Sequence, residues 1–182
     1  DLERFEALNV EIVPFNTMTD DALPEDIDGL FIGGGFPETQ LKRLIGNTSM
    51  LRSVKQAIDQ FLPCYAECGG LMYLCSNLVD ESGSSQLCNV IPAKVRMNKR
   101  PQGRGYVKLE STQSHPWLPQ ESPLQPVNIN AHEFHYSSIE ELPADTQYAY
   151  TVKRGTGIDG INDGIVINNL LASYTHLRQT DS

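Results

Sequence analysis

The sequence predicts a three-layer α/β domain in which helices lie about a mixed, mostly parallel sheet. Three observations support this fold class. Strand patterns alternate with helix patterns up to Leu78, which is typical of a parallel sheet. The apolar run Gly29–Ile32 has the character of a strand buried on both faces of such a sheet. The length of 182 residues falls in the range of one domain with a single core.

Composition narrows the function classes. Hydrophobic residues make up 40% and charged residues 20% of the chain, as in ordinary globular proteins. The net charge of -9 argues against a nucleic-acid partner. No apolar run approaches the roughly 20 residues of a membrane span, and no signal segment begins the chain, so we expect no membrane contact. The four cysteines are interpreted as thiols, which indicates a cytoplasmic protein.

The first residues have the pattern of a helix, Asp1–Leu8, with apolar residues at three-residue spacing. Alternation would place a strand before this helix. We therefore interpret residues 1–182 as one domain that is truncated at its N-terminus. The next segment, Val10–Phe15, has the composition of a strand.

Three consecutive glycines, Gly33–Gly35, end the predicted strand at Gly29–Ile32. The segment Phe36–Glu38 then begins a helix, with proline near its first position and an acid in its first turn. Such a loop leaves backbone N–H groups pointing outward at the carboxyl end of a strand, where open α/β sheets bind ligands. The alternative is a simple tight turn.

A second helix is predicted from about Met50 to Phe61, capped by the segment Asn47–Ser49. Its apolar residues recur at helical spacing and make one face. Pro63 ends this helix, and another buried strand follows.

That strand runs into a sharp turn at Cys68, and a helix is predicted to continue from the turn to Leu78. Ala66 and Gly70, two positions to either side, are small, as a strained strand-to-helix elbow requires when it holds a nucleophile above a sheet. The N–H of Gly69 lies at the start of the helix and can face a developing oxyanion. Cys68 is therefore the candidate nucleophile.

The other cysteines lack such a turn. Cys64, Cys75 and Cys88 are expected to be buried and to behave as small apolar residues. A zinc site is the competing use of cysteine and histidine, but Cys64 and Cys68 lie on either side of a bend, and no CxxC or paired histidine spacing accompanies them. We expect no metal.

Short strands separated by Pro, Gly, Ser and Asn predict a mostly β second half that extends or flanks the sheet in antiparallel fashion. The predicted strands are Gln86–Ile91, Ala93–Met97, Gly105–Glu110, Val127–Tyr136, Tyr148–Lys153, Gly164–Ile167 and Leu170–Tyr174. Between Lys94 and Lys108 lies a basic cluster. It is interpreted as a solvated hairpin, or alternatively as a docking face for an anionic substrate or partner domain. Its further members are Arg96, Lys99, Arg100 and Arg104.

Four histidines compete for the role of base. His115 lies in a loop and is expected to be exposed. His132 and His135 belong to one strand and point to opposite faces of it, where each could line a pocket or be structural. His176 follows a buried run, the place at which a sheet presents a catalytic base. His176 is our choice, with His135 as the substitute.

The residues resemble the class I glutamine amidotransferase domain of the cobyrinic acid a,c-diamide synthase family. The Glu-Cys-Gly-Gly-Leu-Met-Tyr-Leu block is the most specific part, and the similarity covers almost the whole chain in the family's order. The matching segments are Asp28–Glu38, Tyr65–Leu74, His132–Ser137 and Ala172–Leu177.

The resemblance implies a flavodoxin-like fold and glutamine hydrolysis through a glutamyl thioester on Cys68, with His176 as the base. The remaining predicted site residues are oxyanion donors and glutamine contacts: Gly34, Gly35, Gly69, His135 and Tyr136. Many class I glutaminases carry a glutamate two residues after the histidine, and this chain has Arg178 there. We therefore predict a Cys–His dyad without an orienting acid.

The family's synthetase domain uses ATP and magnesium to phosphorylate tetrapyrrole side-chain carboxylates, which ammonia then converts to amides in cobalamin biosynthesis. No GxxxxGK[ST] phosphate loop occurs in residues 1–182. We therefore expect that this domain needs no cofactor of its own and that its partner is the ATP-dependent synthetase domain of the same polypeptide. Three alternatives stay open: a siroheme amidase domain, a stand-alone cysteine amidohydrolase, and a non-catalytic module on the same scaffold.

Overall fold

The computed structural model describes residues 5, 7–118 and 126–177. The predicted first helix lies mostly outside this part of the chain. The helices and strands, in chain order, are β1 (Leu30–Ile32), η1 (Pro37–Gln40), α2 (Leu41–Gly46), α3 (Thr48–Asp59), β2 (Cys64–Glu67), α4 (Gly69–Leu74), β3 (Cys75–Asp80), β4 (Gly83–Gln86), β5 (Ile91–Met97), β6 (Gly103–Ser111), β7 (Asn128–His135), β8 (Ser137–Glu140), β9 (Gln147–Arg154), β10 (Asn162–Ile167) and β11 (Leu170–Ser173).

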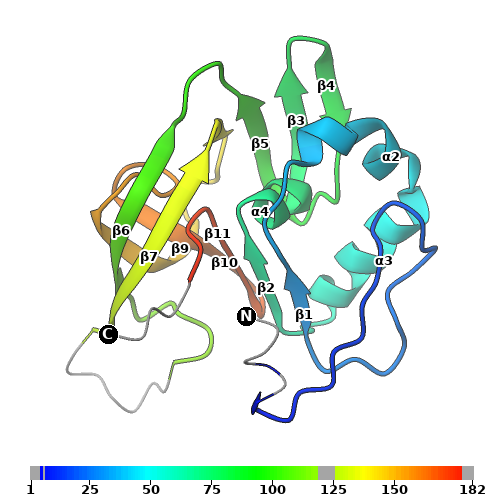
Figure 1. Cartoon of the computed structure of the whole chain (residues 1–182), viewed down its shortest axis with the longest axis horizontal. Helices are drawn as coiled ribbons and strands as arrows, with labels where there is room; N and C mark the ends of the chain where they lie inside the picture. Colours follow the sequence, from blue (N-terminus) through cyan, green and yellow to red (C-terminus); the bar gives the residue numbers. More distant parts are fainter. Residues whose placement is uncertain (1–4, 6, 119–125, 178–182) are drawn as a thin grey trace.

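A large mixed sheet runs through the molecule in the order β1-β2-β11-β10-β9-β6-β7 (Figure 1). Its first three strands are parallel, with β2 between β1 and β11. The remaining pairs are antiparallel, so the second half extends the sheet as the sequence predicts. The α/β class with a mixed sheet is confirmed.

A smaller sheet has the order β4-β3-β5-β8 and lies beside α4 (Figure 1). Its strand β3 begins at Cys75, directly after α4, so the predicted helix to Leu78 is wrong. Leu71, Leu74 and Leu78 follow helical spacing and are all fully buried, which explains the error. From Cys75 onward the backbone instead pairs in parallel with β5.

Helix α3 agrees with the prediction. The Asn47 side chain accepts a hydrogen bond from the N–H of Met50, as an N-cap does. Met50, Val54 and Ile58 are fully buried in the main core. Phe61 was placed on this apolar face and is instead 64% exposed, because the chain leaves the helix there with a φ of 67°.

Three local predictions in the loops are wrong. Val10–Phe15 forms no strand, since the chain runs across the surface with Val10 and Val13 each 47% exposed. The segment Gln86–Ile91 is mostly a connection between β4 and β5. The basic cluster is not a hairpin either, because β5 belongs to the smaller sheet and β6 to the larger one.

Among the described residues, no helix combines the length and the apolar character needed to cross a bilayer.

Candidate active site

Cys68 occupies the sharp turn between β2 and α4. Its backbone has φ 47° and ψ −101°, a conformation that side-chain-bearing residues rarely adopt and that costs of order 1–3 kcal/mol. A backbone hydrogen bond ties the turn to the neighbouring strand, because the N–H of Cys68 donates to the carbonyl of Ser173 on β11 at 2.7 Å. The strained elbow that the sequence predicts is therefore present, and the surrounding sheet maintains it.

Two glycines let the elbow approach the glycine loop after β1. A Cβ at Gly70 would collide with the carbonyl oxygen of Ile32. A Cβ at Gly69 would stand 2.5 Å from the oxygen and 2.8 Å from the nitrogen of Gly35. Gly69 is also the first residue of α4, so its N–H has no partner inside the helix. The structure thus brings Gly35 and Gly69 together beside Cys68.

His176 follows β11 and lies at the same site. Its backbone pairs with that of His132 through two hydrogen bonds of 2.8 and 3.2 Å, and the two imidazole rings stack with centroids 4.8 Å apart. The Cε1 edge of the ring faces Gly34, where a Cβ would lie 2.6 Å from Cε1. Cys68 is close enough to His176 to raise the pKa of the imidazole, and the Cys68 thiol donates to the carbonyl of Phe134 at 3.7 Å.

Glu67, the residue before the nucleophile, contacts the same imidazole. Its Oε2 lies 3.1 Å from Nδ1 of His176. Its Oε1 accepts hydrogen bonds from the N–H of Leu177 at 3.0 Å and from the Tyr65 hydroxyl at 2.9 Å. An acid partner for His176 is therefore present, although the sequence analysis found none.

The electrostatics follow from these contacts. Hydrogen bonds with Cys68 and with Glu67 raise the pKa of His176 to about 9. Burial alone would raise the pKa of Glu67, but the hydrogen bonds from His176, Leu177 and Tyr65 hold the pKa below its usual value. The site therefore favours an ionised carboxylate beside a protonated imidazole at neutral pH.

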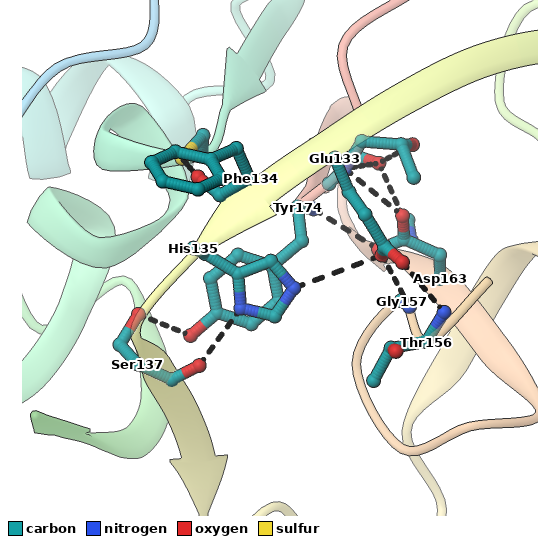
Figure 2. A network of polar contacts seen from close by, with 12 residues as sticks. Glu133, Phe134, His135, Ser137, Thr156, Gly157, Asp163 and Tyr174 are labelled. Carbon is teal, nitrogen blue, oxygen red and sulfur yellow. Dashed lines mark hydrogen bonds and ion pairs between the residues drawn. The ribbon is translucent and has the colours of Figure 1, made fainter. Parts of the chain in front are cut away.

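His135 and Tyr136 line a small pocket together with Cys68. The ring of His135 is turned into a polar network that Figure 2 shows. Its Nδ1 donates to the carbonyl of Ser137 at 2.9 Å, and its face stacks on Tyr174 with centroids 3.8 Å apart. The structure therefore places both His135 and Tyr136 at the pocket beside Cys68, and it is the ring of His176 rather than that of His135 that interacts with Cys68.

Glu133 forms the other end of the network in Figure 2. Its carboxylate accepts the N–H groups of Thr156 and Gly157, both at 2.8 Å, and lies 3.7 Å from Nε2 of His135. Glu133 and His135 are both almost fully buried. These contacts fix the strand end that lines the pocket.

Asp163 supports the segment that carries His176. The carboxylate is completely buried and accepts the Ser173 hydroxyl at 2.8 Å and the N–H groups of Tyr174 and Thr175, both at 3.1 Å. The carboxylate thus accepts hydrogen bonds from backbone N–H groups that have no strand partner after the chain leaves β11. The segment that leads to His176 is thus fixed by hydrogen bonds to a buried carboxylate.

The remaining thiols and His115 lie elsewhere. Cys64, Cys75 and Cys88 are buried as predicted, and burial raises the pKa of Cys64 and of Cys88 to about 12. His115 was expected to be exposed but is half-buried, with Nε2 3.3 Å from the Tyr150 hydroxyl. Within the described residues, no group of three or more potential ligand side chains is arranged to hold a metal ion.

Sequence reasoning missed Glu67 because it searched for the acid after the histidine. Arg178, the residue at that position, lies outside the described residues. The available signal was a carboxylate in a strand that is otherwise apolar, since a buried charge needs a partner. Strand alternation also places Tyr65 and Glu67 on the same face.

The sequence model of the CobB/CobQ-like glutamine amidotransferase domain matches residues 1–181. The chain belongs to this family. Similar proteins of this amidotransferase family include the cobyrinate a,c-diamide synthase of Magnetococcus marinus, which is 40% identical over 97% of this chain and 36% of its own length. That of Caldanaerobacter subterraneus is 40% identical over 97% of this chain and 38% of its own length. The domain therefore spans little more than a third of these relatives.

Solved structures of amidotransferases share the fold. One glutamine amidotransferase superposes with a TM-score of 0.66 at 16% identity, covering 96% of this chain and 82% of that one. Another, from Thermotoga maritima, gives a TM-score of 0.61 at 14% identity over 96% of this chain and 68% of that one. The predicted class I amidotransferase-like fold is confirmed.

Proposed function

We propose that this amidotransferase domain hydrolyses glutamine through a glutamyl thioester on Cys68 and releases ammonia for an amidation reaction. The observation that carries the proposal is that Cys68 occupies a strained strand-to-helix elbow beside His176, whose pKa the thiol helps to raise. A thiol held beside an imidazolium is the usual form of an activated cysteine nucleophile.

In the proposed first step, the Cys68 thiolate attacks the side-chain amide carbon of glutamine. The N–H groups of Gly69 and of Gly34 or Gly35 stabilise the oxyanion, at about 3–4 kcal/mol for each donor in comparable sites. The imidazolium of His176 gives its proton to the amide nitrogen as the carbon–nitrogen bond breaks, and ammonia leaves. The acyl group remains on sulfur as a thioester.

In the second step, His176 accepts a proton from water while the water oxygen attacks the thioester carbon. The carbon–sulfur bond breaks, glutamate is released, and the thiolate returns with the imidazolium. His135 and Tyr136, which line the pocket beside Cys68, are proposed to contact the glutamine.

The relatives suggest where the ammonia goes. Because the similar proteins are named cobyrinate a,c-diamide synthases and are almost three times as long, we infer that an ATP- and magnesium-dependent synthetase domain of the same polypeptide uses the ammonia. The proposed acceptors are tetrapyrrole side-chain carboxylates in cobalamin biosynthesis. The free cysteines Cys64, Cys68, Cys75 and Cys88 favour the cytoplasm as the compartment.

The proposal is tested by labelling the full-length protein with the glutamine analogue diazo-oxo-norleucine and mapping its peptides by mass. We expect label on Cys68 alone, because Cys68 lines a pocket, whereas burial raises the pKa of the other three thiols. Cys68→Ala should abolish glutamine hydrolysis, whereas the matched Cys88→Ala should retain it. Label on a different cysteine, or faster hydrolysis of amides other than glutamine, would overturn the proposal.

A further inference from the structure

We propose that Glu67 is the acid that positions His176, so that the residue directly before the nucleophile completes a Cys68–His176–Glu67 triad. This inference rests on the proposed function of the site. It replaces the predicted dyad with an arrangement in which the acid precedes the nucleophile in the chain rather than following the base.

The first support is that both oxygens of the carboxylate are engaged. Oε2 contacts Nδ1 of His176 at 3.1 Å, and Oε1 accepts the N–H of the next residue, Leu177, at 3.0 Å. The carboxylate therefore holds both the ring and the backbone of the segment that carries the base. With the Glu67 side chain only 6% exposed and Oε1 also bound by Tyr65, the carboxylate has one available orientation.

The second support is the register of the central strands. Strands β2 and β11 are parallel, and Ser173 lies opposite Glu67. The chain that leaves β11 therefore passes over the end of β2, where Glu67 and Cys68 reach the same imidazole. Glu67 and Cys68 are consecutive residues at the end of β2, and both reach the His176 ring. This is possible because the backbone turns sharply at Cys68.

The third support is the tautomer that these contacts select. An ionised carboxylate only accepts hydrogen bonds, so Nδ1 of His176 must donate its proton to Glu67. Because Nδ1 is engaged in this way, Nε2 is the ring nitrogen left to exchange a proton with the Cys68 sulfur. In its neutral form the ring then presents a lone pair to the thiol. Holding the ring in this tautomer is the role of the buried acid in hydrolase triads.

No other described carboxylate takes this role. The titratable groups that contact the His176 ring are Glu67, Cys68 and His132, and His132 meets it face to face rather than through Nδ1. Glu133, the other buried glutamate nearby, is bound to the N–H groups of Thr156 and Gly157.

The test compares Glu67→Gln with wild type in the full-length protein. The amide removes the charge and allows Nδ1 to lose its proton. We expect kcat for glutamine hydrolysis to fall about 10³–10⁴-fold, as for the orienting acid of serine proteases, with KM almost unchanged. The high-pH limb of the rate profile should also move to lower pH. Glu110→Gln, which removes a glutamate paired with Lys153 at the surface, should behave as wild type.

A folded Glu67→Gln protein with unchanged kcat and an unchanged pH profile would overturn the inference. If Cys68→Ala also retains hydrolysis, the proposed function itself is wrong. If Cys68→Ala is inactive while Glu67→Gln is normal, only the role of Glu67 is refuted.

A second measurement needs no variant at position 67. Nitrogen-15 NMR of histidine-labelled wild-type protein, with His176 assigned from His176→Gln, reports which ring nitrogen keeps its proton above pH 9. The triad requires the Nδ1–H tautomer. Observation of the Nε2–H tautomer, which free imidazole side chains favour, would refute the proposal even if Glu67→Gln failed to fold.

Discussion

The imidazole of His176 lies against the backbone of Gly34 so closely that a Cβ there would stand 2.6 Å from Cε1. The glycine loop after β1 is therefore more than a source of backbone N–H groups. It lies against the Cε1 edge of the proposed base, while the ring of His132 stacks on one face of the imidazole.

Gly34→Ala should consequently disturb catalysis without unfolding the protein. The methyl group would displace the ring from its position beside Cys68, and a misplacement of about 1 Å costs of order 10² in rate. Glutamine hydrolysis by the full-length variant, measured as kcat/KM, should fall by about that factor.

Gly46→Ala is the matched control for this change. No heavy atom lies within 4 Å of a Cβ built at Gly46, which ends helix α2. Its hydrolysis rate should equal that of wild type. A normal rate in Gly34→Ala would show that the His176 ring has more room beside Gly34 than the structure indicates.

The raised pKa of His176 predicts the pH dependence of hydrolysis. Contacts with Cys68 and Glu67 keep the ring protonated up to a pKa of about 9, and the protonated ring is the proposed donor to the leaving ammonia. The value of kcat/KM should therefore decline as the pH rises above about 9. A profile that already declines near pH 6.5, the ordinary histidine value, would contradict this assignment.

The same shift links stability to pH. Because the pKa of His176 is higher in the folded than in the unfolded chain, its contribution to stability is complete below about 6.5 and disappears as the pH rises through about 9. Urea unfolding of wild type and His176→Ala should show a difference in the free energy of unfolding that shrinks between pH 6 and pH 10.

Asp163 should contribute more to the free energy of unfolding than an exposed carboxylate does. Asp163→Ala removes the acceptor of the buried N–H groups of Gly164 and Tyr174, so the free energy of unfolding should fall by about 2–4 kcal/mol. Asp159→Ala, which removes an exposed carboxylate bound to Ile161 and Asn162, should lower the free energy of unfolding by about 1 kcal/mol or less. Equal losses in urea titrations would refute the special role of Asp163.

Local chemistry made part of this site predictable. Small residues around Cys68 imply a tight elbow, and glycines after a buried strand imply a close approach of backbones; both features occur in the structure. Asn47 likewise has the side chain that an N-cap requires, and helix α3 begins beside it.

Features that depend on distant pairing were not predictable in the same way. The residues after Leu74 have helical spacing, and only their partner strand β5 makes them a strand. Glu67 meets His176 across 109 positions through the register of β2 and β11, which no local pattern encodes. Val10–Phe15 has strand composition but finds no strand partner.

The position of β11 between β2 and β10 has a consequence for the timing of activity during synthesis. Residues 170–176 leave the ribosome after the other described strands of this sheet, yet they insert into its middle and carry the proposed base. A nascent chain that already displays Cys68 therefore has no imidazole beside it until this last strand enters. The proposed hydrolysis of glutamine therefore requires that β11 has joined the centre of the sheet.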